Sequence, residues 1–177
     1  MSISTISKLF DDDHWKTRSI LIKALTRNDD SGRHGVLVPR EAYPLFPALE
    51  GAKDDNPSVP ITTIWREVVG WRGQQSYFQQ YDRYPERRLT SLNSNLVNRE
   101  GPRLLAIATS GEKGTYRCLA LLPGDSGYDQ LLEALGTIYF ESGSSIVVNL
   151  TAGVPANSKF PELLDQLSVI NRRGWIK

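Results

Sequence analysis

The residues best suited to chemistry form a short polar segment from Gln79 to Thr90. The segment follows a strand-like run and combines arginines, amides, carboxylates and tyrosines. Arginine and amide side chains hold phosphates and hydrogen-bond to base edges in a DNA groove. The segment therefore predicts a contact with nucleic acid.

Positive charge is concentrated in two stretches, although the chain of 177 residues has a formal net charge of only +1. Residues 16–40 hold six Lys or Arg against two Asp or Glu, and residues 72–103 hold six against three. Together the two stretches carry +7, and the rest of the chain carries −6. Such a local basic footprint is what binding to a phosphate backbone requires.

The elements that must position these residues are mostly short strands. Strand-like runs lie at 19–25, 36–38, 59–69, 74–80, 104–109, 116–122 and 144–150, with turn residues between them. A short helix is expected after Pro39, and another over 128–135 with Asp125 or Ser126 as its cap. A linker at 153–159 precedes an amphipathic helix at 161–170. Six or seven short strands predict a closed or nearly closed barrel rather than alternating βαβ units.

Composition and cysteine content indicate a folded domain without processing segments. With 40% hydrophobic and 23% charged residues, the chain is expected to fold around a core of its own. Neither a secretory signal nor a membrane-spanning stretch is visible. The single Cys118 lies in an apolar run, so we expect a buried strand residue and not a reactive thiol. One cysteine cannot form an internal disulfide, which suits a cytosolic protein.

The sequence contains no recognisable motif of a catalytic centre. No lysine follows a carboxylate by two positions, as in many metal-dependent nucleases, and no Gly-rich loop ends in lysine. One cysteine and two histidines cannot supply a zinc site. Asp11, Asp12, Asp13 and His14 form the one metal-like cluster, which we interpret as a solvated turn. A metal-dependent enzyme built on this cluster is the alternative; catalysis by this chain is not expected.

An ordered set of short motifs resembles one family of DNA-binding domains. The matching segments are 22–29, 34–39, 45–47, 56–59, 86–90 and 104–106. Together they resemble the N-terminal effector-binding domain of EcoRII-like Type IIE restriction endonucleases, a B3-like pseudobarrel. The resemblance implies a mainly β fold over residues 1–153: a seven-stranded open barrel with two flanking short helices and a short N-terminal helical extension. It implies that residues 154–177 are a linker towards a nuclease domain.

The resemblance also implies a function. Members of this family grip double-stranded DNA in the major groove with two arms, and the implied target is CCWGG, where W is A or T. The chain would then be the targeting or effector domain of a bacterial, cytoplasmic restriction endonuclease. It would bind as a monomer without a cofactor, and Mg²⁺ is expected only for the nuclease domain. The alternative is a β-barrel module for protein interaction or ligand binding, whose basic loops only keep it soluble.

The resemblance places the two arms on the two basic stretches. The first arm maps onto residues 23–34 and the second onto residues 79–88. The DNA-binding residues that it implies are Lys23, Arg27, Asn28, Asp29, Ser31, Gly32, Arg33, His34, Gln79, Gln80, Asp82, Arg83, Tyr84, Glu86, Arg87 and Arg88.

Side-chain chemistry suggests a role for each kind of arm residue. Arginines are expected to read guanine, and amides to read adenine or bridge to phosphate. Carboxylates are expected to accept from a cytosine amino group or to orient an arginine. Phosphate contacts, which position the protein without specifying sequence, are expected from Lys23, Ser31, Gly32 and His34. For any one charged residue, the alternative is a solvated charge or a surface ion pair.

Overall fold

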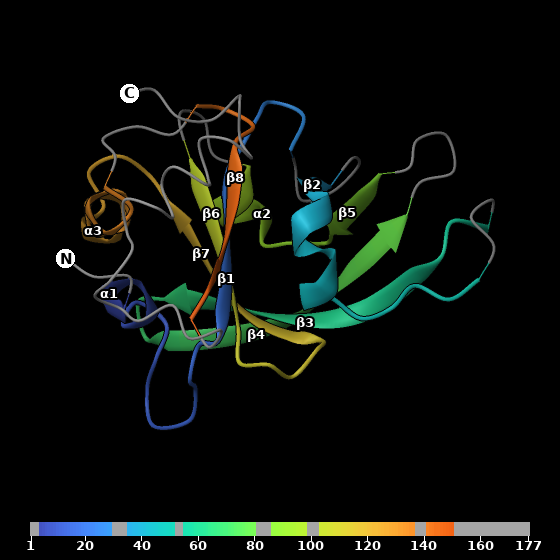
Figure 1. Ribbon diagram of the computed structural model, residues 1–177, viewed down its shortest axis with the longest axis horizontal. Coiled ribbons are helices and arrows are strands. Elements are labelled where there is room, and N and C mark those ends of the chain that lie inside the picture. Colours follow the sequence, from blue (N-terminus) through green and yellow to red (C-terminus); the bar gives the residue numbers. More distant parts are fainter. Residues whose placement is uncertain are drawn as a thin grey trace.

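A single curled sheet dominates the computed structural model, which describes residues 4–29, 35–51, 55–80, 86–98, 103–136 and 141–150 (Figure 1). The sheet has eight strands in the order β2-β5-β4-β3-β7-β6-β1-β8. β3 and β7 run parallel, and the other neighbours run antiparallel. In chain order the strands are β1 (Ser19–Ala24), β2 (Val36–Val38), β3 (Ser58–Glu67), β4 (Gly70–Gln80), β5 (Arg87–Thr90), β6 (Leu104–Thr109), β7 (Thr115–Leu121) and β8 (Ser145–Asn149).

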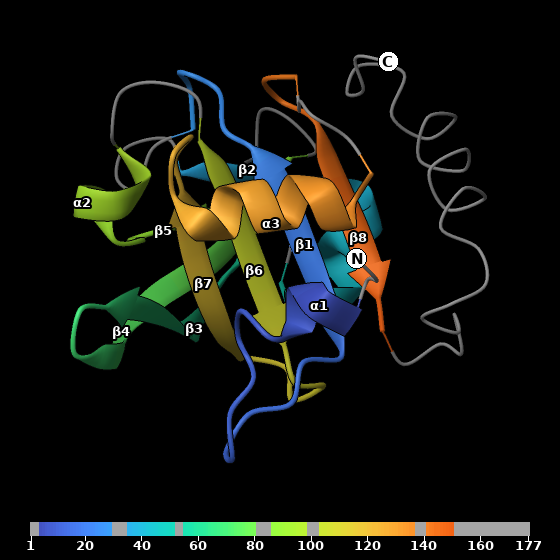
Figure 2. The ribbon, with the colours of Figure 1, turned by 90° about the vertical axis from the view of Figure 1, so that its left-hand side faces the viewer.

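Short helices cover the sheet from one side and line its rim. The α-helices α1 (Ser4–Ser7) and α3 (Ser126–Ala134) lie over the face formed by β7, β6 and β1 (Figure 2). The 3-10 helix η1 (Arg40–Leu45) follows β2, and α2 (Ser94–Val97) follows β5. Within the described residues, no helix is long and apolar enough to cross a membrane.

Two hydrophobic cores lie on opposite faces of β1 and β6. The helix-side core contains Ile20 and Ile22 with residues of α1 and α3. The interior core, enclosed by the curled sheet, contains Leu21 and Leu25 with Trp65 and other apolar side chains. Because alternate residues of a strand point to opposite faces, β1 is buried at every position and reads as one apolar run. The alternation also directs Lys23 towards the barrel interior.

The sequence-predicted fold class is confirmed, with one strand more than expected. The additional strand is β5, which lies in the polar segment 79–90. Of its four residues, only Leu89 is apolar, so no strand pattern was visible in the sequence. The pairing of β5 with β4 and β2 forms this strand: Leu89 lies opposite Phe78 and Val36.

The β3–β4 hairpin also turns earlier than the sequence suggested. We expected the turn at residues 70–73, but Gly70 already belongs to β4, and the tip consists of Val68 and Val69. Both valines are fully exposed, at 105% and 96%. Gly70 has φ +122°, a conformation that favours glycine. The chain can therefore enter β4 at Gly70, directly after the two-residue turn.

Cys118 on β7 is buried in the interior core, as the sequence predicted. Burial raises the pKa of its thiol well above the usual range, because the thiolate loses its hydration. We therefore expect no modification by iodoacetamide in the native state and complete modification in guanidinium chloride, measured by intact mass. Rapid native labelling would show that β7 opens.

Candidate nucleic-acid interface

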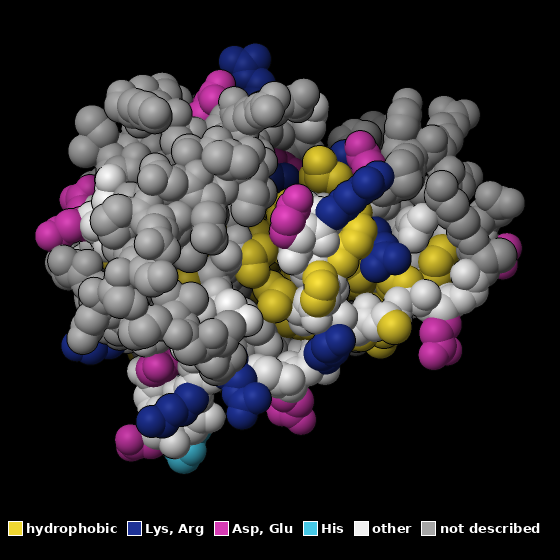
Figure 3. Space-filling model, in the orientation of Figure 1, with side chains coloured by type: hydrophobic (Ala, Val, Ile, Leu, Met, Phe, Trp, Pro, Cys, Tyr) yellow, Lys and Arg dark blue, Asp and Glu magenta, His cyan; other side chains and the backbone are white. Residues whose placement is uncertain are grey.

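The roots of the two arms lie on neighbouring strands. The first arm leaves β1 and returns into β2, and the second leaves β4 and returns into β5. β2 pairs with β5, placing Leu37 opposite Arg88 and Val38 opposite Arg87. In the view of Figure 3, Lys or Arg and Asp or Glu side chains gather with apolar ones where η1, β2 and β5 lie. The fold thus joins the two basic stretches at one ladder, although they are separate in sequence.

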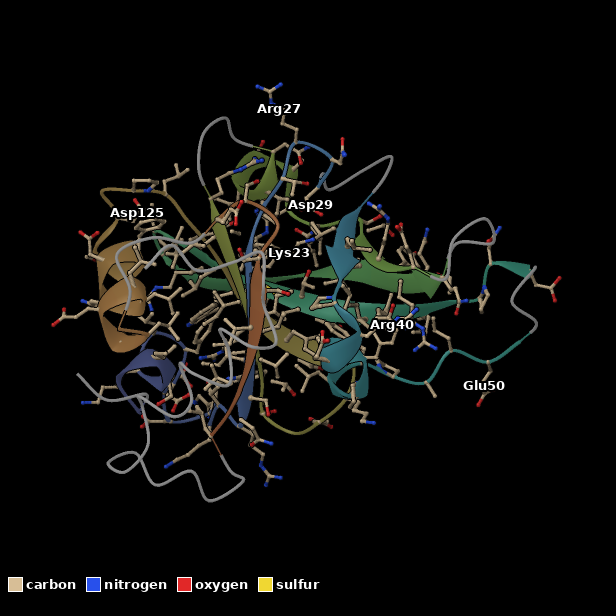
Figure 4. The ribbon with its side chains drawn as sticks, turned by 45° about the horizontal axis from the view of Figure 1, so that its top comes forward. Lys23, Arg27, Asp29, Arg40, Glu50 and Asp125 are labelled. Carbon is tan, nitrogen blue, oxygen red and sulfur yellow. The ribbon has the colours of Figure 1, made fainter. Side chains whose placement is uncertain are left out.

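A buried ion pair holds the root of the first arm. Lys23 Nζ lies 2.9 Å from Asp29 Oδ1, and the two side chains are only 6% and 2% exposed. Figure 4 shows Lys23 and Asp29 near the top of β1. Burial lowers the pKa of the Lys23 ammonium, and the Asp29 carboxylate opposes this shift. A side chain so enclosed does not fit the phosphate contact that we expected of Lys23, nor does Asp29 fit a direct contact with cytosine.

Arg27 and Asn28, in the same arm, are exposed, unlike Lys23 and Asp29. Both are exposed, and the Arg27 side chain projects away from the barrel (Figure 4). The Asn28 backbone N–H donates to Thr26 Oγ1, so this turn is fixed although its side chains face solvent. Both side chains are therefore accessible to a ligand.

Arg88 is oriented by its neighbours in the second arm. One guanidinium nitrogen donates to Glu86 Oε2 at 3.0 Å, and another donates to the backbone oxygen of Gly35 at 3.3 Å. The side chain of Arg88 is 17% exposed. The arrangement matches one of the two roles expected for Glu86, the orientation of an arginine. Arg88 also connects the second arm to the end of the first.

Arg87 leaves β5 on the other side of the strand. Its guanidinium carbon lies 4.5 Å from the ring centroid of Tyr43 and 5.8 Å from that of Phe78, which is buried in the interior core. Arg87 therefore lies on the side of Leu89 and Phe78, whereas Arg88 shares a side with Gln79. Gln79 and Gln80, at the end of β4, are half-buried, and Gln79 Oε1 accepts from Thr90 Oγ1 at 3.4 Å.

Gly35 controls how closely the first arm rejoins the barrel. Its φ is +70°, and a Cβ atom there would lie 2.5 Å from the Leu89 backbone oxygen. Only glycine combines this backbone conformation with such a close approach to β5. Sequence reasoning did not single out Gly35, Thr26 or Tyr43 as supports of the arms. For Gly35, the available signal was a glycine directly before the apolar run at 36–38.

Comparison with known proteins adds one decisive similarity. The B3 domain of the UbaLAI restriction endonuclease, solved in a mutant form with its cognate DNA, superposes with a TM-score of 0.60. The two chains are 31% identical, and the match covers 75% of this chain and 87% of the other. The chain belongs to the B3 domain family. No protein-family model matches this B3 domain, and no curated protein does so at a significant level. The resemblance stated from the sequence is thereby confirmed.

Several predicted site residues of this B3 domain lie outside the described residues. They are Ser31, Gly32, Arg33 and His34 in the first arm, and Asp82, Arg83 and Tyr84 in the second. Among the described arm residues, the fold brings Lys23, Asp29, Glu86 and Arg88 to the two sides of β2. Arg87 lies on the opposite side of β5, over the Tyr43 ring, and Arg27 and Asn28 are exposed to solvent.

The acidic cluster of the B3 domain is a turn bound to the barrel. Asp11 Oδ1 accepts from Thr17 N at 2.8 Å and from Thr17 Oγ1 at 2.6 Å. Asp12 forms an ion pair of 2.7 Å with Arg117, whose hydrogen bond lowers the pKa of the Asp12 carboxyl. Among the residues described, no group of three or more His, Cys, Asp or Glu is arranged to hold a metal ion. The Asp11 and Asp12 carboxylates are thus engaged by Thr17 and Arg117.

Proposed function

We propose that this B3 domain binds double-stranded DNA sequence-specifically through the major groove, at CCWGG, as a monomer. The observation that carries the proposal is the ladder between β2 and β5, which joins the roots of two basic arms. A related B3 domain, 31% identical, has been solved with cognate DNA. The exposed Arg27 and Asn28 and the oriented Arg88 supply donors of the kind that read base edges.

The proposed target agrees with the chemistry of the arms. A CCWGG duplex presents two guanines on each strand, and an arginine fork to guanine O6 and N7 is the commonest specific contact in the major groove. The arms contain five arginines, and the four other than Arg87, which lies over Tyr43 and Phe78, match the four guanines in number: Arg27, Arg33, Arg83 and Arg88. One asymmetric domain would place one arm on each half of this near-palindrome. The central A·T pair would then be tolerated in either orientation because contacts there are weaker.

We further propose a targeting or effector role within a restriction endonuclease. Residues 1–153 would form the B3 domain, and residues 154–177 would connect it to a C-terminal nuclease domain that holds the Mg²⁺. The sequence contains no recognisable nuclease motif, in keeping with a division of labour between recognition and cleavage. The working environment would be the bacterial cytoplasm.

Fluorescence anisotropy with three labelled duplexes tests the proposed function. The duplexes carry CCWGG, CCSGG (S is G or C) or a scrambled sequence, and each is titrated at two salt concentrations. We expect tight binding to CCWGG alone and weak, strongly salt-dependent binding to the others, because non-specific affinity comes from phosphate contacts. Lys113→Ala, at an exposed turn remote from the arms, is the control and should bind like the wild type.

Each other outcome has a definite meaning. Tight binding to another sequence would keep the DNA-binding role and reject CCWGG. Equal affinity for all three duplexes would reject sequence specificity. If no duplex binds in a salt-sensitive way, the DNA proposal fails and a protein-interaction or ligand-binding barrel takes its place.

A further inference from the structure

β2 lies at an end of the sheet, and side chains meet its outer peptide groups. Within the described residues, β5 is the strand with which β2 forms its ladder. Leu37 N donates to Asp29 Oδ1 at 3.0 Å, and Leu37 O accepts from Lys23 Nζ at 2.7 Å. In an antiparallel pair, every second residue turns both peptide groups away from its partner strand. Leu37 is such a residue, and its outward N–H and C=O both find partners.

The Lys23–Asp29 pair thus takes the place of a neighbouring strand. A strand would offer Leu37 one acceptor and one donor, and here a carboxylate and an ammonium offer the same two groups. The lysine comes from β1, which is the next-to-last strand at the other end of the sheet, beside the end strand β8. The ion pair therefore links β1 to β2 across the opening of the barrel. We call this link the seam.

The seam also fixes the first turn of the first arm. The other oxygen of Asp29, Oδ2, accepts from Thr26 N at 2.9 Å and from Thr26 Oγ1 at 3.0 Å. A single carboxylate therefore holds the arm turn, the lysine of β1 and the backbone of β2. Arg27 and Asn28 lie inside the loop that Thr26 and Asp29 close, so their position depends on this carboxylate.

The seam reaches the second arm as well. Leu37 is paired with Arg88, and Arg88 donates to Gly35 O, just before β2. Glu86 holds the other side of the same guanidinium. A displacement of β2 at Leu37 would therefore move Arg88 relative to Arg27. The positions of both arms therefore depend on contacts with β2.

We propose that Lys23 and Asp29 are positioning residues that set the geometry between the two arms and thereby support sequence selectivity. The inference rests on the proposed DNA-binding function. With side chains only 6% and 2% exposed, the two residues would act through the arms and not by touching DNA themselves. A buried ion pair adds little to stability compared with apolar packing of the same volume, but it demands defined directions of hydrogen bonding. These directional requirements suit residues that keep the two arms in a fixed relative orientation.

Hydrogen exchange at the Leu37 amide tests the seam without DNA. Within the described residues, the acceptor for this amide is the Asp29 side chain, so Asp29→Ala should speed its exchange by about tenfold or more relative to Ile107 in β6. The double variant Asp29→Leu with Lys23→Met, which removes the acceptor and leaves no unpaired buried charge, serves if the alanine variant does not fold, and Asp129→Ala, on the exposed face of α3, is the matched control. Unchanged exchange at Leu37 in a folded variant would overturn the seam.

Binding of the variants to DNA tests the positioning role. We expect Asp29→Asn and Lys23→Met to weaken binding to CCWGG by about tenfold, with little change on a scrambled duplex and an unchanged salt slope, because neither residue neutralises a phosphate. Lys113→Met is the control for loss of a lysine. Measurements below the unfolding temperature of each variant separate positioning from loss of the fold.

The outcomes separate this inference from the proposed function. Equal losses on both duplexes, or a salt slope reduced by about one charge for Lys23→Met, would identify a phosphate contact and overturn the positioning role. If the wild type binds no duplex, the DNA function fails and the positioning role falls with it, while the exchange of the Leu37 amide still decides whether the seam exists. Selective loss together with faster exchange supports both parts.

Discussion

Replacement of Arg88 by alanine should weaken binding to CCWGG by roughly 1–3 kcal/mol, or about tenfold and more, and weaken binding to a scrambled duplex far less. Glu86 and Gly35 orient the guanidinium beside β2, so it is pre-organised for a two-pronged contact with a guanine edge. The measurement is anisotropy on both duplexes at one salt concentration, with the melting temperature of the variant as a check on folding.

Arg87→Ala is the matched control for that experiment. Arg87 precedes Arg88 in the same strand but lies over Tyr43 and Phe78 on the side of the interior core. We therefore expect Arg87→Ala to lower stability and to change the ratio between the two duplexes less than Arg88→Ala does. Equal losses of Arg88→Ala on both duplexes would make Arg88 a phosphate contact. A larger selective loss for Arg87→Ala would exchange the roles assigned to the two arginines.

Replacement of Arg117 by alanine should lower the free energy of unfolding by roughly 3 kcal/mol, because a buried side chain that bridges several elements is lost. Arg117 comes from β7 and is 8% exposed. Its guanidinium donates to the Phe10 backbone oxygen at 2.6 Å and lies 5.1 Å and 4.6 Å from the ring centroids of Trp15 and Trp71. Urea denaturation followed by tryptophan fluorescence and circular dichroism measures the loss.

Two further variants show which contacts of Arg117 matter. Arg117→Met keeps the apolar stem and should recover part of the stability, since Nε of Arg117 is buried without a hydrogen-bond partner among the described residues. Asp12→Asn should change little, because Asp12 is exposed. The hydrogen bond of Arg117 lowers the folded-state pKa of Asp12, so the contribution of that pair is present at neutral pH and is lost as the pH falls through this pKa. Wild-type stability in Arg117→Ala would contradict the bridging role.

The strands with regular patterns of side chains were predictable from the sequence. The segments that became β1, β6, β7 and β8 are nearly continuous apolar runs, and turn residues separate β6 from β7. Local composition is sufficient there, because burial on one or both faces requires apolar side chains at those positions. The burial of Cys118 followed from the same reasoning.

Position within the strands, and not residue type, decided the roles of the polar residues. Lys23 and Arg27 are both basic residues of the first arm, yet one is enclosed by Asp29 and Leu37 and the other is exposed. Arg87 and Arg88 are identical neighbours, yet the pleat of β5 sends them to opposite sides. The strand-like run 19–25 includes Lys23 and not Arg27, but no local pattern predicted the Asp29 partner or the sides taken by Arg87 and Arg88.

The sequence by itself determined the fold class, the buried strands and the two basic stretches, because hydrophobic period and local charge are properties of neighbouring residues. Only the tertiary structure decided that β5 is a strand, that β2 and β5 join the arms, and that Lys23 and Asp29 link β1 to β2. Each of these features depends on hydrogen bonds between different elements, which residue type and hydrophobic period do not specify. Such partners are set by the curl of the whole sheet.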